Sequence, residues 1–152
     1  MKTKQEKNNR LLKACEEGDL SSAKQAVVDG ANINCKNRED ERTPAMLAIY
    51  NNHDELADWL ISQESVDVNS GKTYYYETTL HIACGWSKSE EIVSKVAGKT
   101  VNVNAKDKEG NTPVQLAVMQ GNVCGVLGLM SITGIDWQVK DTDGDLLIDL
   151  AR

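Results

Sequence analysis

The sequence repeats itself with a period of 34 or 35 residues, and this period constrains the fold more than any other feature. Alanine recurs at one phase of the period, at Ala14, Ala48, Ala83, Ala117 and Ala151. A second marker, a β-branched residue followed by asparagine, recurs in step with it, at Ile33-Asn34, Val68-Asn69 and Val103-Asn104. Two markers that keep one period along the chain indicate a stack of similar units rather than one globular core.

Each unit is expected to hold two short helices. In the second unit an apolar stretch, Pro44–Tyr50, is followed by a polar turn and a second stretch, Asp54–Ser62. Within the second stretch, Leu56, Trp59 and Leu60 have the spacing of one helical face. Because isolated helices shorter than about 12 residues are marginal in water, neighbouring units must supply the core.

Three motifs recur in phase with the period. The first helices begin at Thr43-Pro44-Ala45-Met46, Thr78-Thr79-Leu80-His81 and Thr112-Pro113-Val114-Gln115. The units end in Gly30-Ala31-Asn32-Ile33-Asn34, Val66-Asp67-Val68-Asn69 and Val101-Asn102-Val103-Asn104, and turns follow at Asp107-Lys108-Glu109-Gly110 and Asp141-Thr142-Asp143-Gly144. Together these motifs resemble the ankyrin repeat, a unit of about 33 residues with a β-turn and two antiparallel helices.

The resemblance covers residues 8–152 and implies an all-α ankyrin-repeat solenoid of stacked helix-turn-helix units with β-turn or hairpin fingers. It implies a single domain over residues 1–152, with repeats at approximately 8–37, 38–72, 73–106 and 107–140 and a partial fifth at 141–152. Thr43 and Thr112 are expected to cap the helices whose first residues are Pro44 and Pro113.

Departures from the pattern are expected at the ends and in the fourth unit. The polar start of the first unit is typical of a capping repeat, and the last unit stops at Arg152 after one helix, which leaves open a continuing chain or an abrupt cap. Gly125 and Gly128 stand at core-facing positions of the fourth unit, and each costs about 1 kcal/mol relative to alanine. This helix is therefore expected to be the least stable, Trp137 to fill the vacated space, and Gly128→Ala to stabilise the protein.

Composition and charge exclude several classes of function. The formal net charge is −6 and the only basic cluster, at the N-terminus, is read as a solvated end, so nucleic-acid binding is not expected. The longest apolar run, Val123 to Met130, is far shorter than the ~20 residues of a membrane helix, so no membrane insertion is expected. The N-terminus shows no secretory signal, and the four cysteines lack the regular spacing of a disulfide framework. The protein is therefore expected in the cytoplasm, with the nucleus as an alternative.

No constellation for catalysis, metal or cofactor binding stands out, so the protein is expected not to be an enzyme and to need no cofactor. His81 and His53 occupy motif positions at which the resemblance implies bonds to backbone and neighbouring repeats. His81 and Cys84 have a chelating spacing, but no other ligand is grouped with them. The segment Asp141–Asp145 begins like a calcium loop but lacks the glycine and the final glutamate that such a loop needs.

The resemblance implies that a partner protein or peptide binds the concave face, formed by the turn tips and the first helices. The positions that vary in the family map to Glu39, Asp40, Arg42, Tyr74, Tyr75, Glu77, Lys108, Glu109, Asn111, Glu16, Glu17, Tyr50, Asn51, Gly85, Trp86, Met119 and Gln120. Tyr76 joins them because Tyr74-Tyr75-Tyr76, Tyr50 and Trp86 are five of only seven aromatic residues. Tyrosine and tryptophan often dominate binding energy, although each finger tyrosine could instead pack on its own loop.

The leading hypothesis is a non-enzymatic protein-interaction module that is itself monomeric. Glu16, Glu17, Glu39 and Asp40 suggest a partner with basic residues beside an apolar anchor. The alternatives are an inhibitory or regulatory subunit that blocks an enzyme, and a substrate-targeting module of a larger protein. The resemblance also implies that Asn34, Asn69 and Asn104 are sites for an asparaginyl hydroxylase.

Overall fold

The computed structural model describes residues 1–140 and 143–146, and this part of the chain holds eight helices. They are α1 (Lys4–Glu17), α2 (Leu20–Val28), α3 (Pro44–Tyr50), α4 (Asp54–Ser62), α5 (Thr79–Trp86), α6 (Glu90–Lys99), α7 (Pro113–Met119) and α8 (Val123–Leu129). The bounds of α3 and α4 are those expected from the sequence. In the described residues β pairing is limited to an isolated antiparallel bridge between Lys140 and Leu146.

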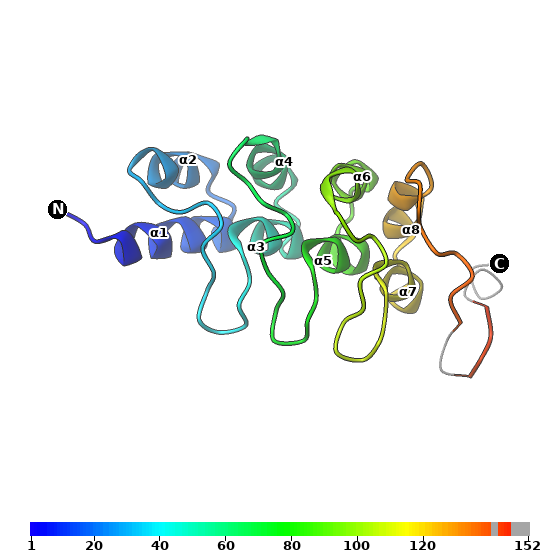
Figure 1. The fold of residues 1–152 in the computed structure, drawn as a ribbon. Helices are drawn as coiled ribbons and strands as arrows, with labels where there is room; N and C mark the ends of the chain where they lie inside the picture. The colour runs from blue at the N-terminus through cyan, green and yellow to red at the C-terminus, as the bar shows by residue number, and fades with distance from the viewer. Residues whose placement is uncertain (141–142, 147–152) are drawn as a thin grey trace.

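The helices form two rows, and a finger-like loop leads into each new repeat (Figure 1). One row consists of α1, α3, α5 and α7, and the other of α2, α4, α6 and α8. The fingers hang from the first row on the side away from the second row. This arrangement confirms the all-α solenoid predicted from the period. Most of the partial fifth repeat predicted at 141–152, including Ala151, lies outside the described residues.

Threonine side chains fix where the first helices begin. The hydroxyls of Thr43 and Thr112 accept hydrogen bonds from the backbone N–H groups of Met46 and Gln115, as predicted. Thr78 caps α5 in the same way. The proline after Thr43 or Thr112 occupies a position where a missing N–H breaks no helical bond. Each helix start is therefore set by local chemistry.

The core is an aliphatic layer between the two helix rows. The four described marker alanines, Ala14, Ala48, Ala83 and Ala117, are at most 3% exposed. Leucine, isoleucine and valine side chains from successive repeats fill the space around them. In the described residues no helix combines the length and the apolarity that crossing a membrane requires. Of the basic N-terminal residues, which were expected as a solvated end, Lys4, Lys7 and Arg10 lie in α1, and Arg10 pairs with Asp29 at 3.0 Å.

The interpretation of the two glycines in α8 was wrong. A Cβ atom at Gly125 would lie 2.3 Å from the carbonyl oxygen of Cys84, and one at Gly128 would lie 2.5 Å from the Cβ atom of Val93. The helix approaches its neighbours so closely that no space is vacated and none remains for Trp137 to fill. Trp137 is instead half-buried against the edge of the core.

Candidate interaction surface

Three fingers stand beside the exposed sides of α1, α3, α5 and α7, and we call this face the finger surface. Finger 1 comprises residues 36–42, finger 2 residues 71–77 and finger 3 residues 106–111. Each finger is closed at its base by a backbone hydrogen bond. The N–H of Asn37 donates to Arg42, that of Thr73 to Glu77, and that of Asp107 to Asn111, at 2.9–3.0 Å.

Finger 2 is also tied to both neighbouring fingers. The backbone N–H of Tyr74 donates to the carbonyl oxygen of Asp40 in finger 1 at 3.3 Å. The backbone N–H of Lys108 in finger 3 donates to the carbonyl oxygen of Tyr75 at 2.8 Å. These bonds use the backbone alone, so they fix the finger without occupying the tyrosine side chains.

The three tyrosines of finger 2 project into solvent. Tyr74, Tyr75 and Tyr76 are 56%, 64% and 55% exposed. In the described residues none of their rings forms a stacked pair, and burial of each ring on its own loop, the alternative considered from the sequence, does not occur. Together they form an exposed aromatic patch on a backbone that is held in place.

Two finger residues have a left-handed backbone conformation that was not predicted from the sequence. Glu41 and Tyr76 have φ values of 62° and 58°, in the left-handed region that is unfavourable for residues with a Cβ atom. At the same phase of the period, finger 3 carries Gly110 and the turn after α8 carries Gly144, with φ values of 85° and 87°. Comparing the residues at this one phase would have revealed that Glu41 and Tyr76 stand where glycine is found later in the chain.

The other two aromatic residues of the finger surface form a separate stack with an arginine. The guanidinium of Arg42 lies 3.9 Å from the centroid of the Tyr50 ring, and the Tyr50 and Trp86 ring centroids lie 5.5 Å apart. Arg42 also pairs with Asp40 at 3.1 Å. All four residues are half-buried, so the stack connects finger 1 to α3 and α5. The structure therefore divides the five aromatics into an exposed triplet and a packed pair.

Glu77 was expected from the sequence to contact a partner, but its side chain is buried. It is 8% exposed, and its carboxyl group accepts a hydrogen bond from the Thr73 hydroxyl at 3.2 Å. Burial raises the pKa of the Glu77 carboxyl above its ordinary value, although the Thr73 bond and the nearby Arg42 oppose this. Its role is to hold the base of finger 2. Gly85 is buried as well.

Most of the remaining candidate residues are exposed where a partner could reach them. Met119 is 58% exposed. The other exposed candidates are Glu16, Glu17, Glu39, Asn51, Lys108, Glu109 and Gln120, whereas Asn111 is half-buried. The structure thus keeps accessible side chains on this face from α1 to α7, with finger 2 between the other two fingers.

The acidic N-terminal end of this surface is balanced by basic residues. A hollow of about 400 Å³ between α1 and finger 1 brings together Glu16, Glu17 and Glu39. Lys13, Lys36 and Arg38 line the same hollow. The formal charges of these six side chains cancel. The bias toward a basic partner that the carboxylates suggested by themselves is therefore not supported by their arrangement.

The two histidines are engaged in structural hydrogen bonds. The Nδ1 atom of His81 accepts from the backbone N–H of Thr78, and Nε2 lies 2.8 Å from the carbonyl oxygen of Asn111 in the next repeat. Burial lowers the pKa of His81, although the Asn111 bond opposes this. His53 similarly places Nε2 2.9 Å from the carbonyl oxygen of Glu16. With both ring nitrogens engaged, His81 has no electron pair available for a metal shared with Cys84.

Three of the four cysteines are unsuited to nucleophilic chemistry. Cys15, Cys35 and Cys84 are buried free thiols. Burial raises the pKa of Cys15 to about 12 and that of Cys35 to about 11, and it also raises the pKa of Cys84. Because the thiolate is the nucleophile, these side chains stay unreactive near neutral pH.

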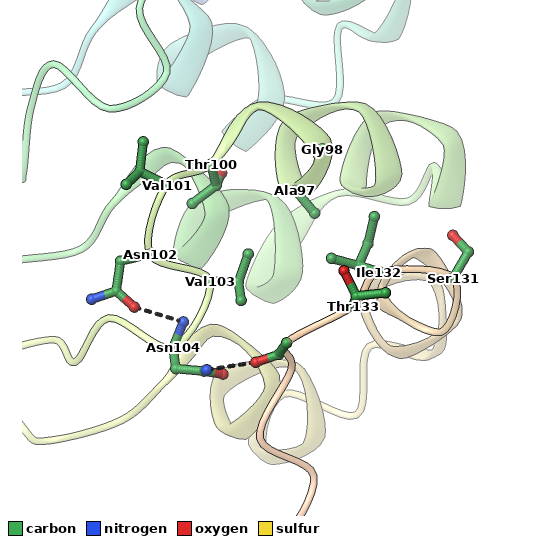
Figure 2. Close-up of a pocket in the computed structure, with 11 residues that line it drawn as sticks. Ala97, Gly98, Thr100, Val101, Asn102, Val103, Asn104, Ser131, Ile132 and Thr133 are labelled. Atoms are coloured by element: carbon green, nitrogen blue, oxygen red, sulfur yellow. Dashed lines mark hydrogen bonds between the residues drawn. The ribbon is translucent and has the colours of Figure 1, made fainter.

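The predicted hydroxylation sites clamp consecutive repeats together. The side-chain amide of Asn104 donates a hydrogen bond to the carbonyl oxygen of Gly134 (Figure 2). Its amide oxygen accepts another from the backbone N–H of Asp136. Asn34 and Asn69 make the same pair of bonds to the repeats that follow them. Asn104 lines a polar hollow of about 490 Å³ at the junction of two repeats. Hydroxylation stays a prediction, which intact-mass measurement would check.

Comparison with known proteins identifies the family. A family model described as ankyrin repeats in three copies matches residues 11–107. Rabankyrin-5 of Mus musculus is 37% identical over 68 residues, 45% of this chain and 6% of that protein. Palmitoyltransferase ZDHHC17 of Danio rerio is 33% identical over 81 residues, 53% of this chain and 13% of that protein. Rabankyrin-5 of Homo sapiens is 23% identical over 141 residues, 93% of this chain and 10% of that protein.

The matches thus cover 6% to 13% of the length of these relatives, so they identify a module and not the activity of a whole protein. The family match spans three of the repeats described above, and the two-row helix stack, the threonine caps and the asparagine clamps recur with the same period. The chain therefore belongs to the ankyrin repeat family.

Proposed function

We propose that this chain is a non-enzymatic module that binds a protein or peptide on its finger surface. Ankyrin repeats generally mediate protein–protein interaction, and the family is typically non-enzymatic. The observation that carries the proposal is the exposure of Tyr74, Tyr75 and Tyr76 on a finger whose backbone is tied to both neighbours. Tyrosines supply large contact area and a hydroxyl group at a low cost in side-chain entropy, which makes them common hot-spot residues.

The rigidity of finger 2 favours tight binding. Its backbone bonds to Asp40 and Lys108 are already formed in the unbound chain. A partner therefore does not have to order this loop, and association loses less conformational entropy than it would with a mobile loop. The charge-balanced hollow beside α1 gives no preference for a basic or an acidic ligand. The expected partner is one that places apolar or aromatic side chains against the tyrosine patch.

The test is a selection from a phage-displayed random peptide library, followed by affinity measurement on the variant Tyr74→Ala/Tyr75→Ala. We expect the Kd of the selected peptides to rise at least about tenfold, since each lost hot spot costs 1.4 kcal/mol or more. Val28→Ala is the matched control, because Val28 is 80% exposed on α2, away from the fingers. Trp86 is left unchanged because it packs against Tyr50. Equal binding by the double variant and the wild type would refute the proposal.

A substrate-targeting role within a larger protein is the second candidate, and the relatives favour it. Each matched relative is far longer than this chain, and one is named a palmitoyltransferase. In such a protein the repeats would hold a substrate while another domain acts on it. An inhibitory role instead requires a stoichiometric partner enzyme whose activity falls on binding. Activity assays on a captured partner, with and without the double tyrosine variant, would separate these roles.

A further inference from the structure

Each of the three fingers has one side-chain oxygen that accepts hydrogen bonds from two backbone N–H groups of the same finger. In finger 1 it is Oδ1 of Asn37, which accepts from the N–H groups three and five residues later. In finger 3 it is Oδ1 of Asp107, which accepts from those two and four residues later. In finger 2 it is the hydroxyl oxygen of Thr73, which accepts from the N–H groups of Tyr75 and Glu77, both at 3.2 Å. We call Asn37, Thr73 and Asp107 the hub residues.

The hub residue of finger 2 differs in chemistry from the other two. The hub oxygens of Asn37 and Asp107 belong to an amide and a carboxylate, so neither atom carries a proton that must be donated. A threonine hydroxyl has one proton to donate in addition to its two acceptor positions. Thr73 is 2% exposed, and a buried donor without an acceptor is costly. A hydroxyl at this position therefore needs an acceptor from the protein itself.

Glu77 supplies this acceptor. The hydroxyl of Thr73 donates to Oε2 of Glu77 at 3.2 Å, and the Glu77 side chain is buried with it. The hydroxyl then uses its proton and both of its acceptor positions. Donation to Glu77 fixes the rotation of the hydroxyl, so that its lone pairs stay directed at the N–H groups of residues 75 and 77. We call the side-chain pair of Thr73 and Glu77 the finger 2 latch.

The latch holds a turn whose backbone is strained. Tyr76, with a φ value of 58°, lies between the two residues whose N–H groups bind Thr73. A side chain in this left-handed region persists only where the surrounding bonds hold the backbone in place. Finger 3 has Gly110 at the same phase, and glycine adopts this conformation without strain. The latch thus helps finger 2 to carry a third tyrosine where finger 3 has glycine.

We propose that the finger 2 latch positions the tyrosine patch, so that Thr73 and Glu77 raise the affinity for a partner without contacting it. The inference rests on the proposed function, because it concerns the affinity of the same surface. Both latch residues are less than one-tenth exposed, whereas the three tyrosines of finger 2 are each more than half exposed. Breaking the latch lowers the fraction of molecules that present the turn in its binding conformation, and the apparent affinity falls by that fraction.

The test compares two substitutions of Glu77, of which one keeps an acceptor. Glu77→Leu removes the acceptor, whereas Glu77→Gln removes the negative charge and keeps a carbonyl oxygen. Amide hydrogen exchange of the full chain, followed by NMR, should be at least about tenfold faster at residues 75 and 77 in Glu77→Leu and within about twofold of the wild type in Glu77→Gln. For a phage-displayed peptide selected on the wild type, Glu77→Leu should raise the Kd at least about threefold and Glu77→Gln less than about twofold.

A rescue separates the latch from a general effect of the substitution on folding. Thr73→Asp/Glu77→Asn copies the pair Asp107 and Asn111 of finger 3, so that a carboxylate oxygen without a proton becomes the hub. This double variant should restore slow exchange at residues 75 and 77, although it lacks Glu77. Exchange in α6, away from the fingers, is the internal control and should be the same in all variants.

The exchange rates distinguish failure of this inference from failure of the proposed function. If Tyr74→Ala/Tyr75→Ala binds the peptide as tightly as the wild type, the proposed function is refuted, and with it the effect of the latch on affinity. If that variant loses binding while Glu77→Leu exchanges and binds like the wild type, the finger surface stands and the latch is refuted. Exchange as fast in Glu77→Gln or in the rescue variant as in Glu77→Leu would also overturn the latch.

Discussion

Gly125 is the position where packing and helix propensity make opposite predictions. The residue lies inside α8, and alanine is favoured over glycine in a helix by about 1 kcal/mol. Propensity alone therefore predicts that Gly125→Ala stabilises the protein. However, the added Cβ would lie 2.3 Å from the carbonyl oxygen of Cys84 in α5 and 2.9 Å from the Cβ of Ala117 in α7. Contacts below 3.0 Å require the helices to move apart.

The size of the destabilisation by Gly125→Ala depends on which atoms the added Cβ would displace. Overpacking a core costs about 1–3 kcal/mol, and the upper end applies here because the closest contact is with backbone rather than with a flexible side chain. Subtracting the propensity gain of about 1 kcal/mol leaves a net destabilisation of about 2 kcal/mol. For a chain of this size that loss corresponds to a Tm lower by about 4–8 °C.

The assay is equilibrium denaturation in guanidinium chloride, combined with a thermal melt. Gly98→Ala is the matched control, because Gly98 lies in α6 and an added Cβ meets nothing within 4 Å. It should raise the free energy of unfolding by up to about 1 kcal/mol. If Gly125→Ala stabilises the protein as much as Gly98→Ala does, the close approach of α8 to α5 and α7 is not a real constraint.

Three further substitutions test other elements. Ala83→Leu should lower the free energy of unfolding by about 1–3 kcal/mol, because Ala83 is fully buried in the tightly packed α5. Tyr76→Gly should raise it by about 0.5–1 kcal/mol by relieving the left-handed backbone, measured by urea denaturation. His81→Gln should leave stability at pH 7.5 nearly unchanged, because Gln115 already makes the equivalent bonds in α7, but should remove part of the loss of stability between pH 6.5 and pH 5.

The burial of His81 determines how its contribution to stability changes with pH. The pKa of His81 is lower in the folded chain than in the unfolded chain, so the unfolded state takes up the proton first as the pH falls. Its contribution to stability is therefore complete above the unfolded pKa and declines below it. Glu77, whose pKa burial raises, contributes in the opposite direction, so only the difference between wild type and His81→Gln isolates the histidine. If the stability of wild type and His81→Gln changes with pH in parallel, this role of His81 is wrong. An unchanged Tm for Ala83→Leu would contradict the close packing of α5. A Tyr76→Gly variant that is less stable than the wild type would show that the left-handed backbone at Tyr76 is not strained.

Much of the fold could be predicted from local patterns. The period identified the stacked units, and the threonine-proline pairs located the starts of α3 and α7 because capping depends on residues within one helical turn. The alanine markers predicted the buried positions of the first helices. The structural roles of His53 and His81 also followed from the repeat pattern, since each bonds to a carbonyl oxygen about one repeat away.

The candidate surface could be predicted only as a set of positions. The repeat pattern placed Glu77 with the contact residues, whereas its carboxyl group is turned into the base of finger 2. Tyr50 and Trp86 were grouped with the finger tyrosines, whereas they stack on each other beneath Arg42. A position in a repeat predicts which face a residue is near, but its side-chain direction depends on neighbours from other repeats.

The sequence by itself determined the repeating unit, its helix starts and the small residues that let units stack, because these depend on local spacing. The tertiary structure decided how closely the units approach. At Gly125 and Gly128 the sequence indicated a loss of packing, and the structure places neighbouring atoms where a Cβ would be. The tertiary structure also decided the charge of this surface. In the sequence Glu16, Glu17 and Glu39 suggest an acidic patch, but α1 and finger 1 place Lys13, Lys36 and Arg38 beside them. Distances between repeats arise from contacts among residues about 20 to 40 positions apart, and no local pattern encodes them.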